Sequence, residues 1–395
     1  MPRQDTPGRD HDLVLYGATG FAGALTAEYL ARHAPEGCRW ALAGRSTAKL
    51  ERLRDRLTAV NPACADLPLL RADSADPDSL RALAAGTRVL ATTVGPYLVH
   101  GEPLVAACAA AGTDYLDLTG EAEFVDRMYL RHDATARASG ARLVHACGFD
   151  SVPYDLGVHY TVGLLPKDVP VRIDGFVRTN GQFSGGTLAS ALTAASRPAA
   201  MARAARARHR AEPRPTGRSV RAPFGPPVHS RETRTWGVPL PTLDPQIVAR
   251  SAAALDHYGP DFRYRHYAGV RRLPTVVAGV VGAGALSVLA QVPPVRRWLS
   301  GRLQPGDGPS QERRARSWFK VRFVASGGEV HLVTEVAGGD PGYDETAKML
   351  AEAALSLAFD DLPETAGQVT TAVAMGDALI RRLRDAGITF RVVSR

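Results

Sequence analysis

The stretch that most constrains the fold runs from Leu13 to Gly23, LVLYGATGFAG, where an apolar run breaks into three closely spaced glycines. Its first four residues have the apolar character of a short buried strand, and the residues from Ala22 onward have the apolar spacing of a helix. The glycines therefore lie at a strand-to-helix turn. Free backbone amides and the helix dipole at such a turn favour a pyrophosphate, so the sequence predicts a nucleotide-binding turn.

Each glycine has a separate purpose in such a turn. Gly17 permits the tight turn, Gly20 lets the backbone approach a phosphate, and Gly23 allows the helix to pack closely on the strand. A structural turn explains many isolated matches of this kind, so the surrounding pattern has to support the interpretation. With the residues between the glycines, the predicted cofactor-binding turn consists of Gly17, Ala18, Thr19, Gly20, Phe21 and Gly23.

The surrounding pattern alternates strands and helices about six times. Further strands are predicted within residues 39–46, 67–76, 87–97, 112–120 and 141–150, and helices within 48–57 and 121–140. Such alternation is typical of a parallel, doubly wound sheet. The predicted fold class is therefore α/β, with a Rossmann-type doubly wound parallel sheet over residues 10–155 that binds ligands beyond the carboxyl ends of its strands.

The end of the second predicted strand distinguishes the two nicotinamide cofactors. An acidic residue there would accept hydrogen bonds from the ribose 2′-hydroxyl of NAD, whereas this chain has Gly44, Arg45 and Ser46. Arg45 can pair with a 2′-phosphate and Ser46 can donate to it, which favours NADP(H). The alternative is an ordinary surface arginine at a helix start, where a cation otherwise opposes the helix dipole.

Residues after the third and fourth strands complete the predicted cofactor site. Asp73 is placed to approach the adenine, although a cap on the next helix explains it equally well. Thr93, Gly95 and Pro96 follow the fourth strand, where the backbone is expected to run along the nicotinamide side. Tyr97 is then expected to point toward the crevice.

Composition and charge narrow the class of protein. The 395 residues are 45% hydrophobic and 22% charged, with a formal net charge of +8. The charge favours acidic partners, but no basic helix interleaved with aromatics is present, so nucleic-acid binding is not expected.

The four cysteines form no CxxC pair and the eleven histidines have no metal-ligand spacing, so neither a disulfide framework nor a metal site is predicted. The N-terminus lacks the apolar core of a secretion signal, which indicates a cytoplasmic protein.

Five segments carry a family resemblance. They are YGATGFAG, AGRS, TTVGPYLVHGEPLVAACAAAGTDYLDLTGE, HACGFDSVPYDLG and, near the C-terminus, VTTAVAMGDALIRRLRDAGITF. Together they resemble the saccharopine dehydrogenase-like oxidoreductases, in particular the bacterial branch of trans-acting enoyl reductases, over roughly residues 12–160 and 340–392. The resemblance implies a soluble or lipid-associated NADPH-dependent oxidoreductase that reduces a carbon–carbon double bond on acyl chains carried by polyketide synthases. Saccharopine-type reductases instead reduce an imine, and family membership transfers fold and cofactor better than substrate.

Beyond about residue 155 the alternation of strands and helices is lost. VRIDGFVRTNG and SWFKVRFVASGGEVHLVTEVAGGD are predicted strands, the second with a hairpin turn at its paired glycines. A second α+β substrate domain containing an antiparallel sheet is therefore expected over residues 156–340. The C-terminal helices within 341–395 are expected to pack back on the Rossmann domain, so that the chain crosses between the domains twice.

Two segments of the middle region suggest partners. Seven arginines lie between Arg203 and Arg221, either on a solvated helix end and loop or in a docking patch for an acidic acyl carrier protein, a polyketide synthase or anionic lipid. Residues 273–295 carry no charge and fit a buried or pocket-lining helix, an interfacial membrane attachment or, least well, a spanning helix. Peripheral membrane contact and a homodimer stay open.

Hydride transfer requires little from a protein beyond positioning and a proton donor or polarising group. The YxxxK pair of short-chain dehydrogenases is absent, which argues against carbonyl–alcohol chemistry by that route. Candidate proton donors near the crevice are Tyr97, Asp150 and Tyr154, although a turn cap before Pro153 explains Asp150 equally well. Cys147 has no adjacent base and is expected to be a small core residue.

Three hypotheses of function remain. The first is NADPH-dependent reduction of a double bond in a small-molecule or carrier-bound acyl substrate. The second is saccharopine-type chemistry on an imine or amino acid. The third is a non-catalytic nucleotide-binding or lipid-associated protein.

Overall fold

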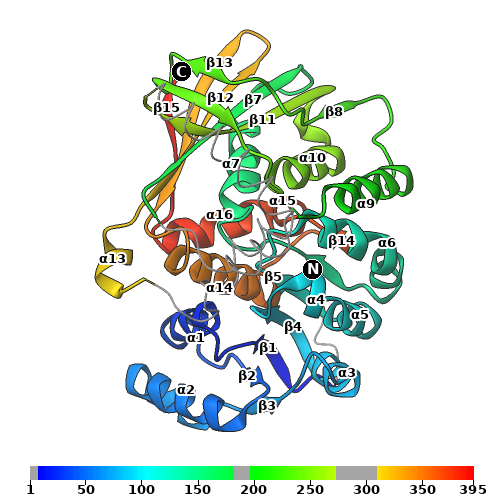
Figure 1. The fold of residues 1–395 in the computed structure, drawn as a ribbon, viewed down its shortest axis with the longest axis vertical. Coiled ribbons are helices and arrows are strands. Elements are labelled where there is room, and N and C mark those ends of the chain that lie inside the picture. The colour runs from blue at the N-terminus through cyan, green and yellow to red at the C-terminus, as the bar shows by residue number, and fades with distance from the viewer. Residues whose placement is uncertain (1–7, 182–195, 273–308) are drawn as a thin grey trace.

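Two β-sheets organise the computed structural model, which describes residues 8–181, 196–272 and 309–395 (Figure 1). Sheet A has seven strands, all parallel to their neighbours, in the order β14-β6-β5-β4-β1-β2-β3. Its strands are β1 (His11–Tyr16), β2 (Trp40–Gly44), β3 (Leu69–Arg71), β4 (Thr87–Thr92), β5 (Asp114–Asp117), β6 (Arg142–Val144) and β14 (Gly367–Val369). The predicted Rossmann-type parallel sheet is therefore confirmed.

Both faces of sheet A are covered, because successive side chains of its strands point to opposite sides. Along β1, Leu13 and Leu15 join one buried apolar cluster, whereas Val14 and Tyr16 join the other. The covering helices that precede the second sheet are α1 (Phe21–His33), α2 (Thr47–Val60), α3 (Pro77–Ala85), α4 (Tyr97–His100), α5 (Glu102–Ala111) and α6 (Ala122–Ser139), with the short η1 (Pro62–Asp66). This double cover explains why the middle residues of β1, β2 and β4 form continuous apolar runs.

Sheet B has the order β15-β13-β12-β7-β11-β10-β9, and β8 pairs with β11 outside this path. Its strands are β7 (Val171–Thr179), β8 (Ser219–Arg221), β9 (Val228–Ser230), β10 (Thr235–Pro239), β11 (Asp261–Val270), β12 (Phe319–Gly327), β13 (Val330–Gly338) and β15 (Thr389–Ser394). The predicted hairpin is confirmed, because Gly327 pairs with Val330 across the turn between β12 and β13.

The sheet is mixed, however, and not simply antiparallel. β7 and β11 run parallel, as do β8 and β11. Some eighty residues of chain separate β7 from β11, enough for the chain to return to the same end before the second strand starts.

In the middle region of the chain, one helix connects sheet A to sheet B, and further helical segments lie between the strands of sheet B. The elements are α7 (Val152–Val162), α9 (Pro198–Ala211), α10 (Asp244–Ala254), η2 (Asp256–Tyr258) and α13 (Gln311–Ala315). Helix α7 follows directly on the last turn of sheet A and packs against β12 and β13 of sheet B. The junction between the sheets is therefore built around the segment that joins β6 to α7.

The C-terminal segment belongs to both sheets. α14 (Asp344–Phe359) packs against α1 and three strands of sheet A, and β14 then extends that sheet beside β6. After α15 (Thr371–Ala374) and α16 (Gly376–Asp385), β15 pairs with β13 at the edge of sheet B. The chain thus crosses between the sheets three times, one more than the sequence predicted, because the strand pattern of β15 was not recognised.

The sequence hypothesis for residues 273–295 lies outside the described residues. Within the ranges that the structure describes, none of the helices is long and apolar enough to cross a membrane.

Candidate active site

In the glycine turn between β1 and α1, an added side chain would clash at two of the three glycines and would find space at the third. Gly17 has a φ of +85°, and a Cβ there would lie 2.7 Å from Cγ2 of Val94. A Cβ at Gly23 would lie 2.2 Å from the carbonyl oxygen of Gly17, so only glycine lets α1 approach the strand. At Gly20 the nearest atom to an added Cβ is 3.4 Å away. The open side of Gly20 fits the approach of a phosphate to the start of α1, which no side chain caps.

The remaining residues of the turn differ in exposure. Ala18 is buried, whereas Thr19 is exposed. The ring of Phe21 lies 4.7 Å from that of Tyr343 and beneath the guanidinium of Arg314. α13 and the start of α14 therefore approach the same turn from the second half of the chain.

Arg45 is exposed directly beyond β2, and Ser46 is the N-cap of α2 without a capping hydrogen bond from its side chain. Tyr16 ends β1 nearby. Burial raises the pKa of its phenol, and the charges of Asp73 and Arg45 both act on it. Residues from the ends of three adjacent strands thus meet at one place, where an arginine and a hydroxyl can hold a 2′-phosphate.

The structure shows what Asp73 does in the fold. Its carboxylate accepts a hydrogen bond from the N–H of Ala75 at 3.0 Å, which closes a turn after β3. The cap of α3 is Asp76, which accepts from the N–H groups of Asp78 and Ser79. Asp73 therefore does not cap the next helix, and it stands beside the predicted adenosine end of the site.

The segment after β4 holds the glycine turn in place. The N–H of Thr93 donates to the carbonyl of Tyr16 at 3.0 Å, and its hydroxyl donates to the carbonyl of Gly17 at 3.1 Å. Gly95 and Pro96 follow and are exposed. This places the backbone after β4 beside the turn, as a nicotinamide-side wall requires.

The side chain of Tyr97 makes its hydrogen bonds within the fold. Its side chain is buried, and its hydroxyl donates to the carbonyl of Thr92 and accepts from the N–H of Leu118, both at 3.1 Å. Its backbone N–H and that of Leu98 donate to the carboxylate of Glu121. Tyr97 therefore ties the ends of β4 and β5 together, and its hydroxyl does not point into an open crevice.

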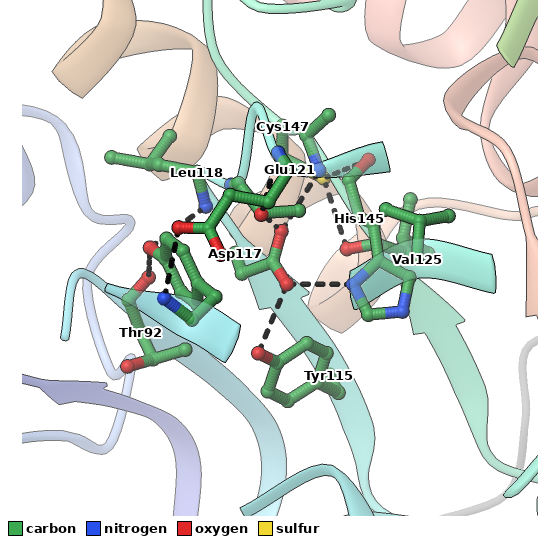
Figure 2. A network of polar contacts seen from close by, with 12 residues as sticks. Thr92, Tyr115, Asp117, Leu118, Glu121, Val125, His145 and Cys147 are labelled. Carbon is green, nitrogen blue, oxygen red and sulfur yellow. Dashed lines mark hydrogen bonds and ion pairs between the residues drawn. The ribbon is translucent and has the colours of Figure 1, made fainter. Parts of the chain in front are cut away.

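A buried network surrounds Asp117 at the ends of β5 and β6 (Figure 2). The carboxylate accepts hydrogen bonds from the hydroxyl of Tyr115 at 3.0 Å and from Nδ1 of His145 at 2.6 Å. It also accepts from the N–H groups of Thr119 and Ala146. Four donors satisfy this carboxylate, which is fully shielded from solvent. The Asp117 network therefore fixes the two strand ends that face the junction.

Asp150 lies just beyond this network, where the chain leaves sheet A. A Cβ at Gly120 would lie 3.2 Å from Oδ1 of Asp150, so the carboxyl packs against the loop after β5. The residue retains partial exposure. Burial raises its pKa to about 7, and the charge of Asp117 adds to the effect. A large fraction of Asp150 therefore holds its proton near neutral pH.

A second carboxyl, Asp244, approaches from the start of α10. It is buried, and burial raises its pKa to about 8, with the charge of Asp150 contributing. The hydroxyl of Ser151 donates to its Oδ1 at 3.4 Å. We call Asp150 and Asp244 the acid pair. Since burial disfavours the charged form of both carboxyls, the pair retains protons that solvent-exposed carboxyls would lose.

Aromatic groups of β11 and α7 support the acid pair. Nε2 of His266 lies 3.6 Å from Oδ2 of Asp244, and its Nδ1 shares a hydrogen bond of 2.8 Å with the hydroxyl of Tyr264. Burial lowers the pKa of His266 to about 3, so its imidazole is neutral. The ring of Tyr154 stands edge-on to it at 4.8 Å. Tyr154 is buried beside the acid pair, and burial raises the pKa of its phenol.

Sequence analysis missed several residues of this region. Asp117, Glu121 and His145 lie inside quoted segments, and the polar residues that end two predicted strands were the available signal. Asp244 and His266 lie in the middle region, and no local pattern connects them to Asp150. Cys147 is buried, its thiol donates to the carbonyl of Val144, and burial raises its pKa well above the usual value, so it carries no thiolate.

Similarity to known proteins defines the class of oxidoreductase to which this chain belongs. Residues 13–144 match the family model described as the saccharopine dehydrogenase NADP binding domain. The whole fold is similar to apo saccharopine dehydrogenase (L-Glu forming) from Saccharomyces cerevisiae, with a TM-score of 0.56 and 11% identity, covering 97% of this chain and 99% of that chain. The chain is thus an NADP-dependent oxidoreductase of saccharopine dehydrogenase fold, and NADP(H) is its cofactor.

The sequence relatives are more specific. A Mycobacterium tuberculosis protein described as a trans-acting enoyl reductase is 40% identical, covering 97% of both chains. The trans-acting enoyl reductase of Mycobacterium leprae is 37% identical, covering 96% of this chain and 97% of that protein. The chain belongs to the family of trans-acting enoyl reductases.

Proposed function

We propose that this protein reduces the carbon–carbon double bond of an α,β-unsaturated acyl thioester with NADPH. The observation that carries the proposal is the acid pair, which lies past the strand ends of the NADP-binding sheet, where this fold class places the reacting end of the cofactor. The relatives described as enoyl reductases support the same reaction.

Each residue of the site has a separate role in the proposed reduction. Reduction of the double bond adds a hydride at the β-carbon and a proton at the α-carbon, and NADPH held by Gly20, Arg45 and Ser46 would supply the hydride. Asp150 supplies the proton that the α-carbon then requires, because it retains a proton near neutral pH and keeps partial access to the junction. Asp244, also protonated but buried, has a positioning role beside Asp150, since the hydroxyl of the adjacent Ser151 donates to it.

The other candidates have supporting places in this proposal. Arg45 and Ser46 hold the 2′-phosphate, and Gly20 gives the pyrophosphate access to the start of α1. Tyr154 packs against His266 and thereby positions Asp244. The hydrogen bonds of Tyr97 to Thr92 and Leu118 favour a role in holding the strand ends, and we assign the proton to Asp150 instead.

The substrate in this proposal is an acyl chain attached to a carrier, because the relatives are described as trans-acting, which means that they act on a chain held by a separate protein. Carriers of polyketide synthases present their acyl chains as thioesters. The reactive group is then the same in free and carrier-bound substrates.

The test is NADPH oxidation by the purified protein with crotonyl thioesters of N-acetylcysteamine and of an acyl carrier protein. We expect oxidation that requires the unsaturated thioester, is much slower with NADH and is largely lost in Asp150→Asn. Oxidation with an imine of an amino acid but not with either thioester would overturn the proposal in favour of saccharopine-type chemistry. Tight NADPH binding without oxidation of any substrate would support a non-catalytic protein.

A further inference from the structure

The arginine-rich helix α9 has two different faces. Arg208 is buried and pairs with Asp126 of α6 and with Glu212. Just before the helix, Arg197 pairs with Glu123 through two hydrogen bonds of 2.8 Å. Arg208 therefore anchors α9 to helix α6, which excludes it from the predicted docking patch.

The opposite face carries Arg203, Arg206 and Arg210, spaced three and four residues apart so that they align along the helix. All three are exposed, and no described residue forms an ion pair with them. With Ala199, Ala202 and Ala207 they line a hollow of about 520 Å³. We call these six residues the α9 surface. It combines three exposed positive charges with small side chains that let another helix approach closely.

The α9 surface is linked to the acid pair through a short chain of contacts. Asp126, which holds Arg208 from one side, also accepts a hydrogen bond of 2.8 Å from the side chain of Gln246. Gln246 lies in the first turn of α10, two residues after Asp244 of the acid pair. α9 and α10 are therefore fixed to the same point of α6, and Figure 1 shows them as neighbours on one side of the molecule.

We propose that the α9 surface is the docking site for an acidic helix of an acyl carrier protein. The inference rests on the proposed function, since it names the partner that delivers the thioester to the acid pair. Acidic side chains of the carrier helix would pair with Arg203, Arg206 and Arg210, and a convex helix would fill the hollow between them.

An anionic membrane is the less suitable occupant. Helices that lie in a membrane interface carry Trp, Phe or Leu on the face that enters the lipid. The exposed apolar residues of the α9 surface are alanines, and they line a hollow instead of a protruding ridge. A helix of a protein partner matches both features.

The test compares the full-length Arg203→Glu, Arg206→Glu, Arg210→Glu triple variant with a control that reverses three exposed arginines elsewhere, Arg52, Arg56 and Arg172. Two readouts are needed. Steady-state kinetics use crotonyl-loaded acyl carrier protein and crotonyl-N-acetylcysteamine as substrates. Fluorescence anisotropy measures binding of the labelled carrier protein without turnover.

We expect the triple variant to raise KM for the carrier-bound substrate at least tenfold, with kcat and kcat/KM for the free thioester unchanged, and to weaken carrier binding in parallel. The control variant should match the parent protein. Carrier binding that depends on the three arginines in a protein that reduces neither thioester would support docking while overturning the proposed function.

Three results would overturn the docking proposal. The first is an unchanged KM for the carrier-bound substrate and unchanged carrier affinity in the triple variant. The second is an equal loss with free and carrier-bound substrates, which would mean that the substitutions disturb the site itself. The third is loss of binding to phosphatidylglycerol vesicles with carrier binding intact, which would identify the surface as a membrane contact.

Discussion

Two buried carboxyl sites stand close together at the strand ends of sheet A, and they differ in how they are satisfied. The Asp117 network gives its carboxylate four donors, two of them backbone N–H groups. The acid pair has fewer donors, and burial raises both of its pKa values, with the charge of Asp117 adding to the effect at Asp150 and that of Asp150 at Asp244. A carboxyl with many donors holds the fold together, whereas a buried carboxyl with fewer donors keeps its proton more readily and can deliver it.

The largest effect should come from the acid pair. Asp150→Asn preserves shape but removes the proton, so we expect kcat for crotonyl thioesters to fall by about 10²- to 10⁴-fold while the Kd for NADPH stays unchanged. Tyr97→Phe is the matched comparison. Because its hydroxyl bonds only backbone groups, it should retain most of kcat and lose about 1 kcal/mol of unfolding free energy. A reversed outcome, with kcat lost in the tyrosine variant alone, would make Tyr97 the donor.

The Asp117 network should respond in the opposite way. Asp117→Ala leaves the Tyr115 hydroxyl, the His145 ring and two backbone N–H groups buried without their acceptor. We expect a loss on the order of 3–5 kcal/mol in the free energy of unfolding, measured by urea denaturation. Asp66→Ala, at an exposed position, should change it by less than about 0.5 kcal/mol. Equal stability of the two variants would show that the network is not structural.

The pH dependence sharpens the contrast further. Because Asp150 acts in its protonated form, kcat should be constant below its pKa of about 7 and fall roughly tenfold per pH unit above it. For stability, Asp244 binds its proton in the folded chain up to about pH 8 but in the unfolded chain only below about pH 4. The contribution of Asp244 to the free energy of unfolding should therefore decrease by about 1.4 kcal/mol per pH unit as pH rises through this window, and Asp150 adds a change of the same sign up to about pH 7.

The control for this effect is Asp244→Asn, which cannot titrate. The difference in unfolding free energy between the variant and the parent should move in favour of the variant as the pH rises from 5 to 8. If the two profiles run parallel, Asp244 titrates normally in the folded protein and the acid pair does not exist as described.

The smallest effect should come from Arg45, which is exposed directly beyond β2. Arg45→Ala removes the proposed 2′-phosphate partner and should weaken NADPH binding about tenfold, as measured by titration of protein fluorescence. NADH, which lacks that phosphate, should bind the variant and the parent alike. Equal weakening for both cofactors would show that Arg45 does not recognise the 2′-phosphate.

The sequence predicted the parts of this molecule that depend on local pattern. The glycines, the apolar strands and the residues after β2 lie next to one another in the chain, and their spacing alone indicates a turn and a cofactor. The sequence does not predict strands β14 and β15. β14 has only three residues, too few to show a periodic pattern, and most residues of β15 are exposed.

The acid pair could not be predicted for a different reason. Asp150 was identified as a candidate because it follows a strand, but its partner Asp244 lies 94 residues later, and only the fold brings them together. Arg208 shows the same limit, since its neighbours in sequence are exposed while it is buried against Asp126. Burial of a polar side chain depends on distant elements that the local sequence does not reveal.

The chain passes three times between the two sheets, which restricts how its parts can be exchanged during evolution. β14 completes sheet A and β15 completes sheet B, yet both come from the last thirty or so residues. No single cut in the chain separates sheet A from sheet B, so one crossover between two such genes cannot exchange one sheet and leave the other complete.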